Sequence, residues 1–241
     1  MNARERFLKY MHFEKTDRVP FYEWFLCWGE TLNRWYGEGL PKKPRMYDVF
    51  LPDSGFTLNW ALPSDPFAEL IDIVEYFGFD GATGISIDFG PIPRFVKRVL
   101  EVTEEYTIEV DEAGIKRKNP RVATSMPQFL EFPVKDEGDF EKIKARYDPD
   151  DVRRYPKNWS GELIEYYNSL DLPLGVGMAG FFGISRNLLG VERLLVSFYK
   201  NPNLVKEIMD FWADFLIETL RRAVEEVKID YATIWEDMAY K

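Results

Sequence analysis

The sequence predicts an α/β fold, and the order of its segments leads to this prediction. Apolar segments typical of buried strands alternate with amphipathic helices, the longest at residues 203–227. Strands separated by long helices pair in parallel through right-handed crossovers, which argues against an all-β sandwich. No Gly-x-Gly-x-x-Gly segment follows a strand, so a dinucleotide site has little support. On pattern alone, a barrel and a doubly wound sheet both remain open.

The individual elements follow from periodicity and from turn residues. A short amphipathic helix is expected at residues 2–11, where Asn2 is a suitable N-cap. Residues 95–118 alternate in polarity and close at a turn at Gly114, which predicts a β-hairpin insertion. The remaining expected strands are 19–26, 80–88, 172–178 and 229–235, and the remaining helical segments are 31–35, 66–76, 138–146, 160–168, 186–199 and 203–227.

Composition excludes several classes of protein. With 241 residues, 46% of them hydrophobic, the chain can bury a substantial core. Its net charge of −10 argues against a nucleic-acid surface, so small molecules or protein partners remain. No window reaches the ~18 apolar residues of a membrane span, and residues 1–12 do not resemble a secretory signal. We therefore expect no membrane partner and a cytoplasmic location.

Soft metal ligands are almost absent. The chain has one cysteine, Cys27, and one histidine, His12, so an internal disulfide is excluded and a zinc site within this chain is not expected. Cys27 is interpreted as a small buried hydrophobe and His12 as an exposed helix end. Any metal bound by this stretch alone would be held by oxygen atoms.

Carboxylates follow two of the expected strands. Asp88 ends the strand at 80–88, and Glu236 and Asp237 follow the strand at 229–235. Parallel strands place their C-terminal ends on one side of a barrel, so we expect these residues to converge there, together with Tyr22 or Glu23. Carboxylates brought close together raise one pKa and supply an acid and a base.

Each candidate also has an ordinary structural interpretation. Asp88 could cap the loop at residues 89–91, and Glu236 and Asp237 could be solvated loop residues. Arg94 and Arg186 are candidates for anion binding, Arg186 because we expect it at a helix start after a glycine-rich turn. Arg186 could equally be a surface arginine.

Several segments together resemble the uroporphyrinogen decarboxylase superfamily. They are Arg4–Leu8 through Glu14–Pro20, Gly78–Ala82 with Asp88 at the strand end, Pro133–Asp136, Ala179–Gly183, and Asn201–Pro202 before the long helix. The resemblance implies a TIM barrel, with residues 1–241 as one domain and the hairpin at about 95–118 as an insertion. A barrel needs eight strands, so we also expect that the later strands are missing from this sequence.

The resemblance implies roles for the candidate residues. Asp88 matches the decarboxylases' essential aspartate, which accepts hydrogen bonds from pyrrole N–H groups, a task that an ionised carboxylate performs without a metal. In the methyltransferase branch, methylcobalamin or a corrinoid protein donates a methyl group, and a His-x-Cys pair with a later Cys holds a zinc that activates a thiol. Neither His12 nor Cys27 has that spacing, so such a zinc would belong to the full-length protein.

The departures from the decarboxylases favour a methyltransferase-like enzyme. Decarboxylases carry Arg-Gln-Ala-Gly-Arg after the first strand, where this chain has Glu23–Trp28, and their active-site tyrosine falls on Leu188. An acidic mouth would repel a polyanionic porphyrinogen, with Arg94 and Arg186 as partial compensation. A porphyrinogen decarboxylase with a rebuilt site and a barrel retained for binding without catalysis are the alternatives.

Overall fold

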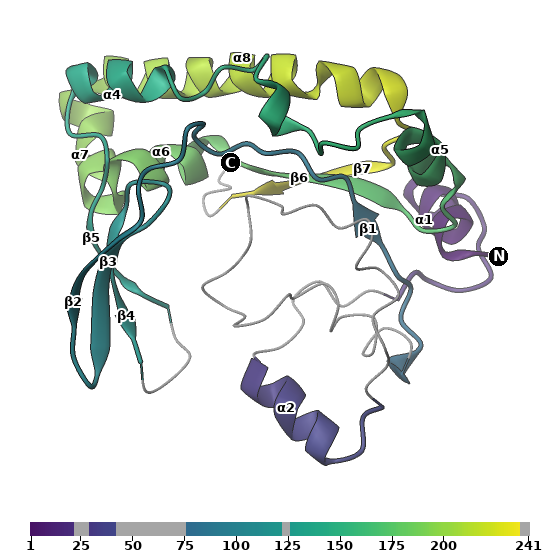
Figure 1. Ribbon diagram of the computed structural model, residues 1–241. Helices are drawn as coiled ribbons and strands as arrows, with labels where there is room; N and C mark the ends of the chain where they lie inside the picture. The colour runs from purple at the N-terminus through teal and green to yellow at the C-terminus, as the bar shows by residue number, and fades with distance from the viewer. Residues whose placement is uncertain (22–28, 42–75, 122–125, 237–241) are drawn as a thin grey trace. The chain divides into compact units, whose positions relative to one another are not determined.

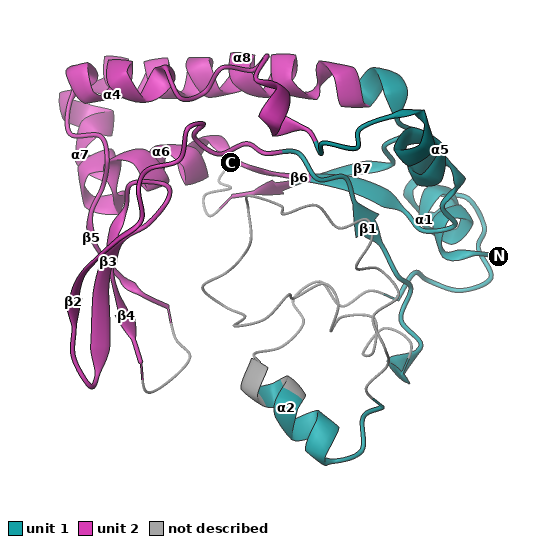
Figure 2. Ribbon diagram, viewed as in Figure 1, with its two compact units in different colours: residues 1–87, 156–176, 224–233 teal, residues 88–155, 177–223, 234–241 magenta. Residues whose placement is uncertain are grey.

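The computed structural model describes residues 1–21, 29–41, 76–121 and 126–236, and the chain is mixed α/β (Figure 1). It divides into two compact units (Figure 2): unit 1 comprises residues 1–87, 156–176 and 224–233, and unit 2 comprises residues 88–155, 177–223 and 234–241. Strands β6 (Leu174–Ala179) and β7 (Tyr231–Trp235) begin in unit 1 and end in unit 2. A single barrel domain over residues 1–241 stays a prediction.

Three strands form one sheet, in the order β1 (Thr83–Gly84), β6, β7. β1 and β6 are parallel, with Thr83 opposite Leu174 and Gly84 opposite Gly175. The strands predicted at 172–178 and 229–235 are confirmed. The strand predicted at 80–88 is reduced to two residues, because glycines at 81 and 84 weaken strand pairing.

The first predicted strand is not formed in its described part, residues 19–21. Pro20 has no N–H to donate to a neighbouring strand. The backbone of Phe21 instead pairs with Asp80: the Phe21 N–H donates to the Asp80 carboxylate and the Phe21 carbonyl accepts from the Asp80 N–H, both at 2.7 Å. Residues 22–26 of this predicted strand lie outside the described residues.

The antiparallel strands predicted at residues 95–118 are confirmed, and they belong to a larger sheet than expected; their role as an insertion in a barrel stays a prediction. Within unit 2, β2 (Arg98–Val102), β3 (Tyr106–Val110), β4 (Lys116–Pro120) and β5 (Gln128–Glu131) form a four-stranded antiparallel sheet in chain order. Gly114 adopts φ +84° in the turn between β3 and β4. Glu109 is buried in this sheet; burial raises its pKa, but bonds from Arg117 and Asn119 and the charge of Lys97 hold it below the usual value.

Most predicted helices are confirmed. The α-helices of the described residues are α1 (Ala3–Met11), α2 (Gly29–Gly37), α4 (Glu137–Lys144), α5 (Gly161–Ser169), α6 (Phe181–Leu189), α7 (Val191–Lys200) and α8 (Pro202–Glu226). The single helix predicted at 186–199 is wrong: α6 and α7 are separated at Gly190, whose φ of +81° breaks the helix. Residues 76–77 are helical, and the rest of the helix predicted at 66–76 lies outside the described residues.

Apolar and aromatic side chains of α8 contribute to the core of unit 2. Trp212 and Phe215 are each 2% exposed, and both rings pack against Tyr147. The indole of Trp212 donates to the carbonyl of Ala179 at 2.9 Å, which joins α8 to the end of β6.

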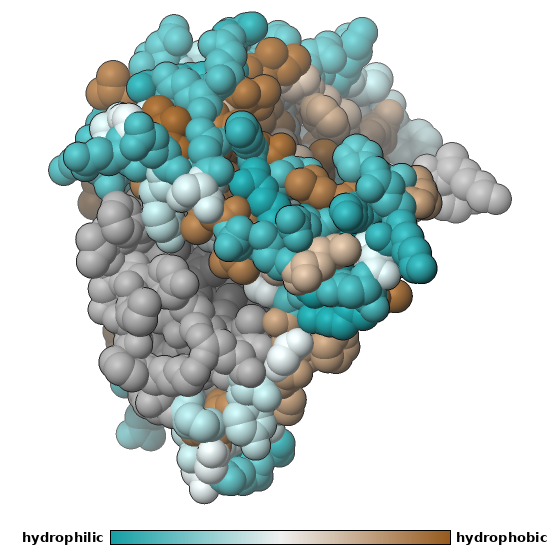
Figure 3. All heavy atoms as spheres, turned by 90° about the vertical axis from the view of Figure 1, so that its right-hand side faces the viewer, coloured by the Kyte–Doolittle hydropathy of each residue, from teal (hydrophilic) through white to brown (hydrophobic). Residues whose placement is uncertain are grey.

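Among the described helices, none is both long and apolar enough to cross a membrane. Hydrophilic residues cover much of the face in Figure 3, with hydrophobic residues between them.

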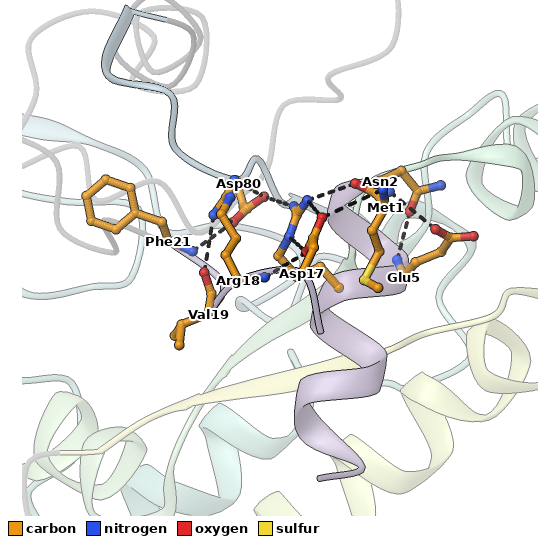
Figure 4. Close-up of polar contacts among 9 residues, drawn as sticks. Met1, Asn2, Glu5, Asp17, Arg18, Val19, Phe21 and Asp80 are labelled. Carbon is orange, nitrogen blue, oxygen red and sulfur yellow. Dashed lines mark hydrogen bonds and ion pairs between the residues drawn. The ribbon is translucent and has the colours of Figure 1, made fainter. Parts of the chain in front are cut away.

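Asp80 is the centre of a buried charge network in unit 1 (Figure 4). Its side chain is 3% exposed and accepts from Arg6 at 2.5 Å and from Arg18 at 2.6 Å. Arg6 also binds Asp17 at 2.7 Å, and this bond holds the pKa of Asp17 well below its usual range. Arg6 is the buried residue of α1. A buried carboxylate needs such partners, because an unpaired buried charge is costly.

Candidate functional site

Asp88 is the first residue of unit 2 and lies in the loop after β1. One carboxylate oxygen, Oδ1, accepts from the backbone N–H of Gly90 at 2.8 Å, and Oδ2 forms an ion pair with Nη2 of Arg94 at 2.7 Å. The loop cap considered for Asp88 is therefore present. A carboxylate offers about four acceptor positions, and the Asp88 side chain is 19% exposed, so the cap leaves acceptor capacity for a ligand.

Gly90 makes room for the ion pair between Asp88 and Arg94. A Cβ atom at Gly90 would lie 1.8 Å from Nη1 of Arg94 and 3.2 Å from Oδ1 of Asp88. The same Nη1 donates to the carbonyl of Pro91 at 3.2 Å. Asp88 and Arg94, expected as an acid and an anion binder, form one charge-neutral pair.

The backbone of the Asp88 loop is held by a buried arginine. Arg154 ends the short 3₁₀ helix Val152–Arg154 and is 1% exposed. Its Nη1 donates to the carbonyls of Asp88 at 2.9 Å and Gly90 at 3.0 Å, and the Arg154 carbonyl accepts from the Asp88 N–H at 2.7 Å. The loop is thus fixed through its backbone as well as through its side chains.

Glu236 follows β7 and binds the N-terminus of α6. Its Oε2 accepts from the N–H of Phe182 at 2.9 Å and its Oε1 from the N–H of Gly183 at 3.2 Å. The unpaired N–H groups and the dipole of a helix stabilise an anion at this end. A Cβ atom at Gly180 would lie 2.3 Å from Oε2, so this glycine admits the carboxylate. The anion bound at the N-terminus of α6 is therefore the side chain of Glu236.

The position predicted for Arg186 is wrong. We expected it at the start of a helix, but α6 already begins at Phe181, directly after Gly180, and Arg186 lies in its last turn. The helix dipole therefore does not favour an anion beside Arg186. Burial lowers the pKa of the Arg186 guanidinium, and the charge of Glu236 acts in the opposite direction.

The remaining candidates lie partly outside the described residues. The candidates outside them are Tyr22, Glu23, Asp237 and Cys27. The proposed convergence of Asp88 with these side chains and with Glu236 stays a prediction. His12 is confirmed as an exposed residue at the end of α1. Within the described ranges, no three His, Cys, Asp or Glu side chains are grouped so that they could hold a metal ion.

These contacts change the electrostatic argument made from the sequence. An acidic mouth was expected, but Asp88 is paired with Arg94, and Glu236 is bound by helix N–H groups. The carboxylates of Asp88 and Glu236 therefore each have a partner within the chain that carries positive or partial positive charge. Repulsion of an anionic substrate is weaker than the composition of the segments suggests.

Sequence reasoning missed Arg154 and Tyr147. Burial raises the pKa of the Tyr147 phenol to about 12. The charge of Arg154 acts to lower this pKa, and the charge of Asp88 acts to raise it. The only signal for Arg154 is a pair of neighbouring arginines, and the side chain of the other, Arg153, is 61% exposed. The two differ through tertiary contacts, which no local pattern predicts.

No protein-family description, curated protein or solved structure matches this chain.

Proposed function

We propose that this chain forms part of a TIM barrel of the uroporphyrinogen decarboxylase superfamily and carries out a methyltransferase-like reaction with a corrinoid donor. The observation that carries the proposal is the Asp88 carboxylate after β1, fixed by Gly90 and Arg94 and still 19% exposed. Active sites of parallel barrels are built from the loops after the strands. The parallel pairing of β1 with β6 is what a barrel requires, and it is also found in a doubly wound sheet.

In this proposal Asp88 binds substrate as a hydrogen-bond acceptor. An ionised carboxylate suits an N–H or O–H group of the substrate, and Arg94 balances its charge. Tyr22 and Glu23, from the first predicted strand, and Glu236, Asp237 and Arg186 complete the proposed site. Methylcobalamin or a corrinoid protein, when bound, supplies the methyl group, and a thiol is the acceptor. No step is assigned to zinc in this chain.

One observation favours a second candidate, porphyrinogen decarboxylation. The Asp88–Arg94 pair is charge-neutral, so it does not repel a substrate that carries several carboxylates. The essential aspartate of the decarboxylases accepts hydrogen bonds from pyrrole N–H groups, and Asp88 offers the same acceptor. We rank this candidate second because Glu23–Trp28 lacks the arginines that those enzymes use to bind the substrate carboxylates.

The test compares two assays and two matched variants. Methyl transfer from methylcobalamin to a thiol is measured beside coproporphyrinogen formation from uroporphyrinogen. Asp88→Asn keeps an oxygen for the Gly90 N–H but loses the charge, and we expect the methyl-transfer rate to fall about 100-fold. Asp111→Asn is the control, because Asp111 also caps a turn, at Ala113 and Ile115, and pairs with Arg117.

The outcomes separate the functions. Methyl transfer that falls in Asp88→Asn and persists in Asp111→Asn supports the proposal. Coproporphyrinogen formation that depends on Asp88, without methyl transfer, replaces it with the decarboxylase. Absence of both reactions in the folded protein favours a barrel retained for binding.

A further inference from the structure

Arg154 is the largest fully buried side chain of the described residues, and its guanidinium group donates to four backbone carbonyl oxygens. Nε donates to Asp148 at 2.5 Å, and Nη2 donates to Arg146 at 3.2 Å. Nη1 donates to Asp88 at 2.9 Å and to Gly90 at 3.0 Å. One guanidinium group therefore joins two loops of unit 2, the loop after β1 and the loop after α4.

Burying this charge is costly, so its contacts need a structural reason. Burial lowers the pKa of Arg154 from its usual value, which shows that the surroundings disfavour the charged form. The ring of Phe215 lies 4.5 Å from the guanidinium carbon and compensates part of this cost as a cation–π partner. Only arginine presents donors in a planar fork that can reach several carbonyls at fixed angles. We therefore interpret these contacts as ones that fix the position of the backbone, and not as ones that mainly stabilise the fold.

The bonds around Asp88 form a closed arrangement. The Arg154 carbonyl accepts from the Asp88 N–H at 2.7 Å while the guanidinium binds the Asp88 and Gly90 carbonyls, so the backbone is held on both sides of the Asp88 Cα atom. The Ile92 N–H donates to the carbonyl of Arg146 at 2.7 Å, which ties the end of the same loop to the second one. Arg94 holds the Asp88 side chain and makes one bond to the loop backbone, at the carbonyl of Pro91.

We propose that Arg154 is the positioning residue of Asp88: it fixes the backbone from which the carboxylate is directed, without contacting substrate. This inference rests on the proposed role of Asp88. A carboxylate that must meet a substrate N–H or O–H group needs a defined direction, because a displacement near 1 Å can cost about 100-fold in rate. The bonds from Arg154 to the loop backbone keep the carboxylate in that direction.

The test uses Arg154→Lys and Arg154→Gly in the full chain, with Arg153→Lys as the matched control. Lysine keeps the charge but not the planar fork, and the glycine variant leaves space that added guanidinium ion can fill. Arg153 is the neighbouring arginine, and it binds Asp151 with a side chain that is 61% exposed. Two readouts are taken: steady-state methyl transfer, and hydrogen exchange of the backbone amides at residues 88–92 compared with α8.

We expect Arg154→Lys to lower kcat by about 10- to 100-fold with little change in KM. The amides of Gly90 and Ile92 should exchange faster while those of α8 keep their protection. Guanidinium at concentrations that do not unfold the protein should restore part of the kcat of Arg154→Gly. Arg153→Lys should leave both readouts unchanged.

The two proposals fail in different ways. Unchanged exchange at residues 88–92 in Arg154→Lys overturns the positioning role, whatever the activity. Faster exchange in the loop with unchanged kcat, in a protein whose Asp88→Asn variant is slow, also overturns it. An Asp88→Asn variant with wild-type turnover instead refutes the proposed function.

Discussion

The two compact units each bury a charged group, and they compensate it in different ways. In unit 1, Asp80 is surrounded by the guanidinium groups of Arg6 and Arg18 and by one backbone N–H. In unit 2, Arg154 is surrounded by four backbone carbonyls. Opposite charges attract strongly at low dielectric, whereas carbonyl dipoles replace the water that the charge has lost. The first arrangement joins side chains from distant segments, and the second fixes backbone.

This difference sets what each site loses when its central residue is removed. Without Asp80, two guanidinium groups remain close together, and one of them, Arg6, is buried. Without Arg154, four neutral carbonyls lose a donor, but the buried charge disappears as well. Arg6 keeps its ion pair with Asp17, but Arg18 loses its carboxylate partner next to the buried Arg6 guanidinium, so we expect the first change to cost more.

The largest effect expected is that of Asp80→Ala, which should reduce the free energy of unfolding by about 3–5 kcal/mol. The matched variant, Arg154→Met, should cost less, about 1–3 kcal/mol, because it leaves only neutral groups unpaired. Urea unfolding followed by circular dichroism gives both values. An Arg154→Met variant less stable than Asp80→Ala would break the comparison, since carbonyl contacts would then outweigh the ion pairs.

The Asp80 network also shows what the sequence could predict. Helix α1, its N-cap Asn2 and the hairpin sheet depend on local signals, and they were predicted. The strand at 19–21 was not formed, because Phe21 pairs with Asp80, a residue far away in the sequence. A local apolar pattern contains no information about such a partner. Gly190 divides the helix predicted at 186–199. A glycine is a local signal for a helix end, but the prediction gave more weight to the apolar periodicity.

The candidate site was predictable to a smaller extent. Asp88 was identified because it ends an expected strand, and Arg94 was named as a candidate for anion binding, but their pairing depends on the space at Gly90. Glu236 was identified as a carboxylate after a strand, and its partners at the start of α6 could not be inferred while that helix was expected to begin later. Arg154 was missed because burial, and not residue type, gives it its role.

Tyr147 provides a pH-dependent test of the unit 2 environment. Burial raises the pKa of its phenol from 10.0 to about 12, against the opposing charges of Arg154 and Arg94. The folded state therefore keeps this proton when the unfolded state loses it. The resulting stability is present below pH 10 and is lost as the pH rises from about 10 to about 12.

Tyr147→Phe should remove this part of the alkaline loss of stability. Urea midpoints measured for both proteins across this pH range should converge as the pH rises, and ultraviolet titration of the phenols in the folded wild type should show one more late-ionising tyrosine than in the variant. Parallel midpoint curves for the two proteins would mean that the phenol is not shielded by the packing around Arg154.

The smallest effect expected lies in unit 1, at the start of α1, where Asn2 and Glu5 form a capping box. Asn2 Oδ1 accepts from the N–H of Glu5 at 2.8 Å, the Glu5 carboxylate accepts from the Asn2 N–H at 3.3 Å, and Asn2 Nδ2 donates to Asp171 at 2.7 Å. Asn2→Ala should cost about 1 kcal/mol in the free energy of unfolding. Asn2→Ser keeps the cap but loses the bond to Asp171, so it should stay within about 0.5 kcal/mol of the wild type if the cap is the main contribution. Equal losses in both variants would assign the stabilisation to the exposed bond from the Asn2 amide to the Asp171 carboxylate.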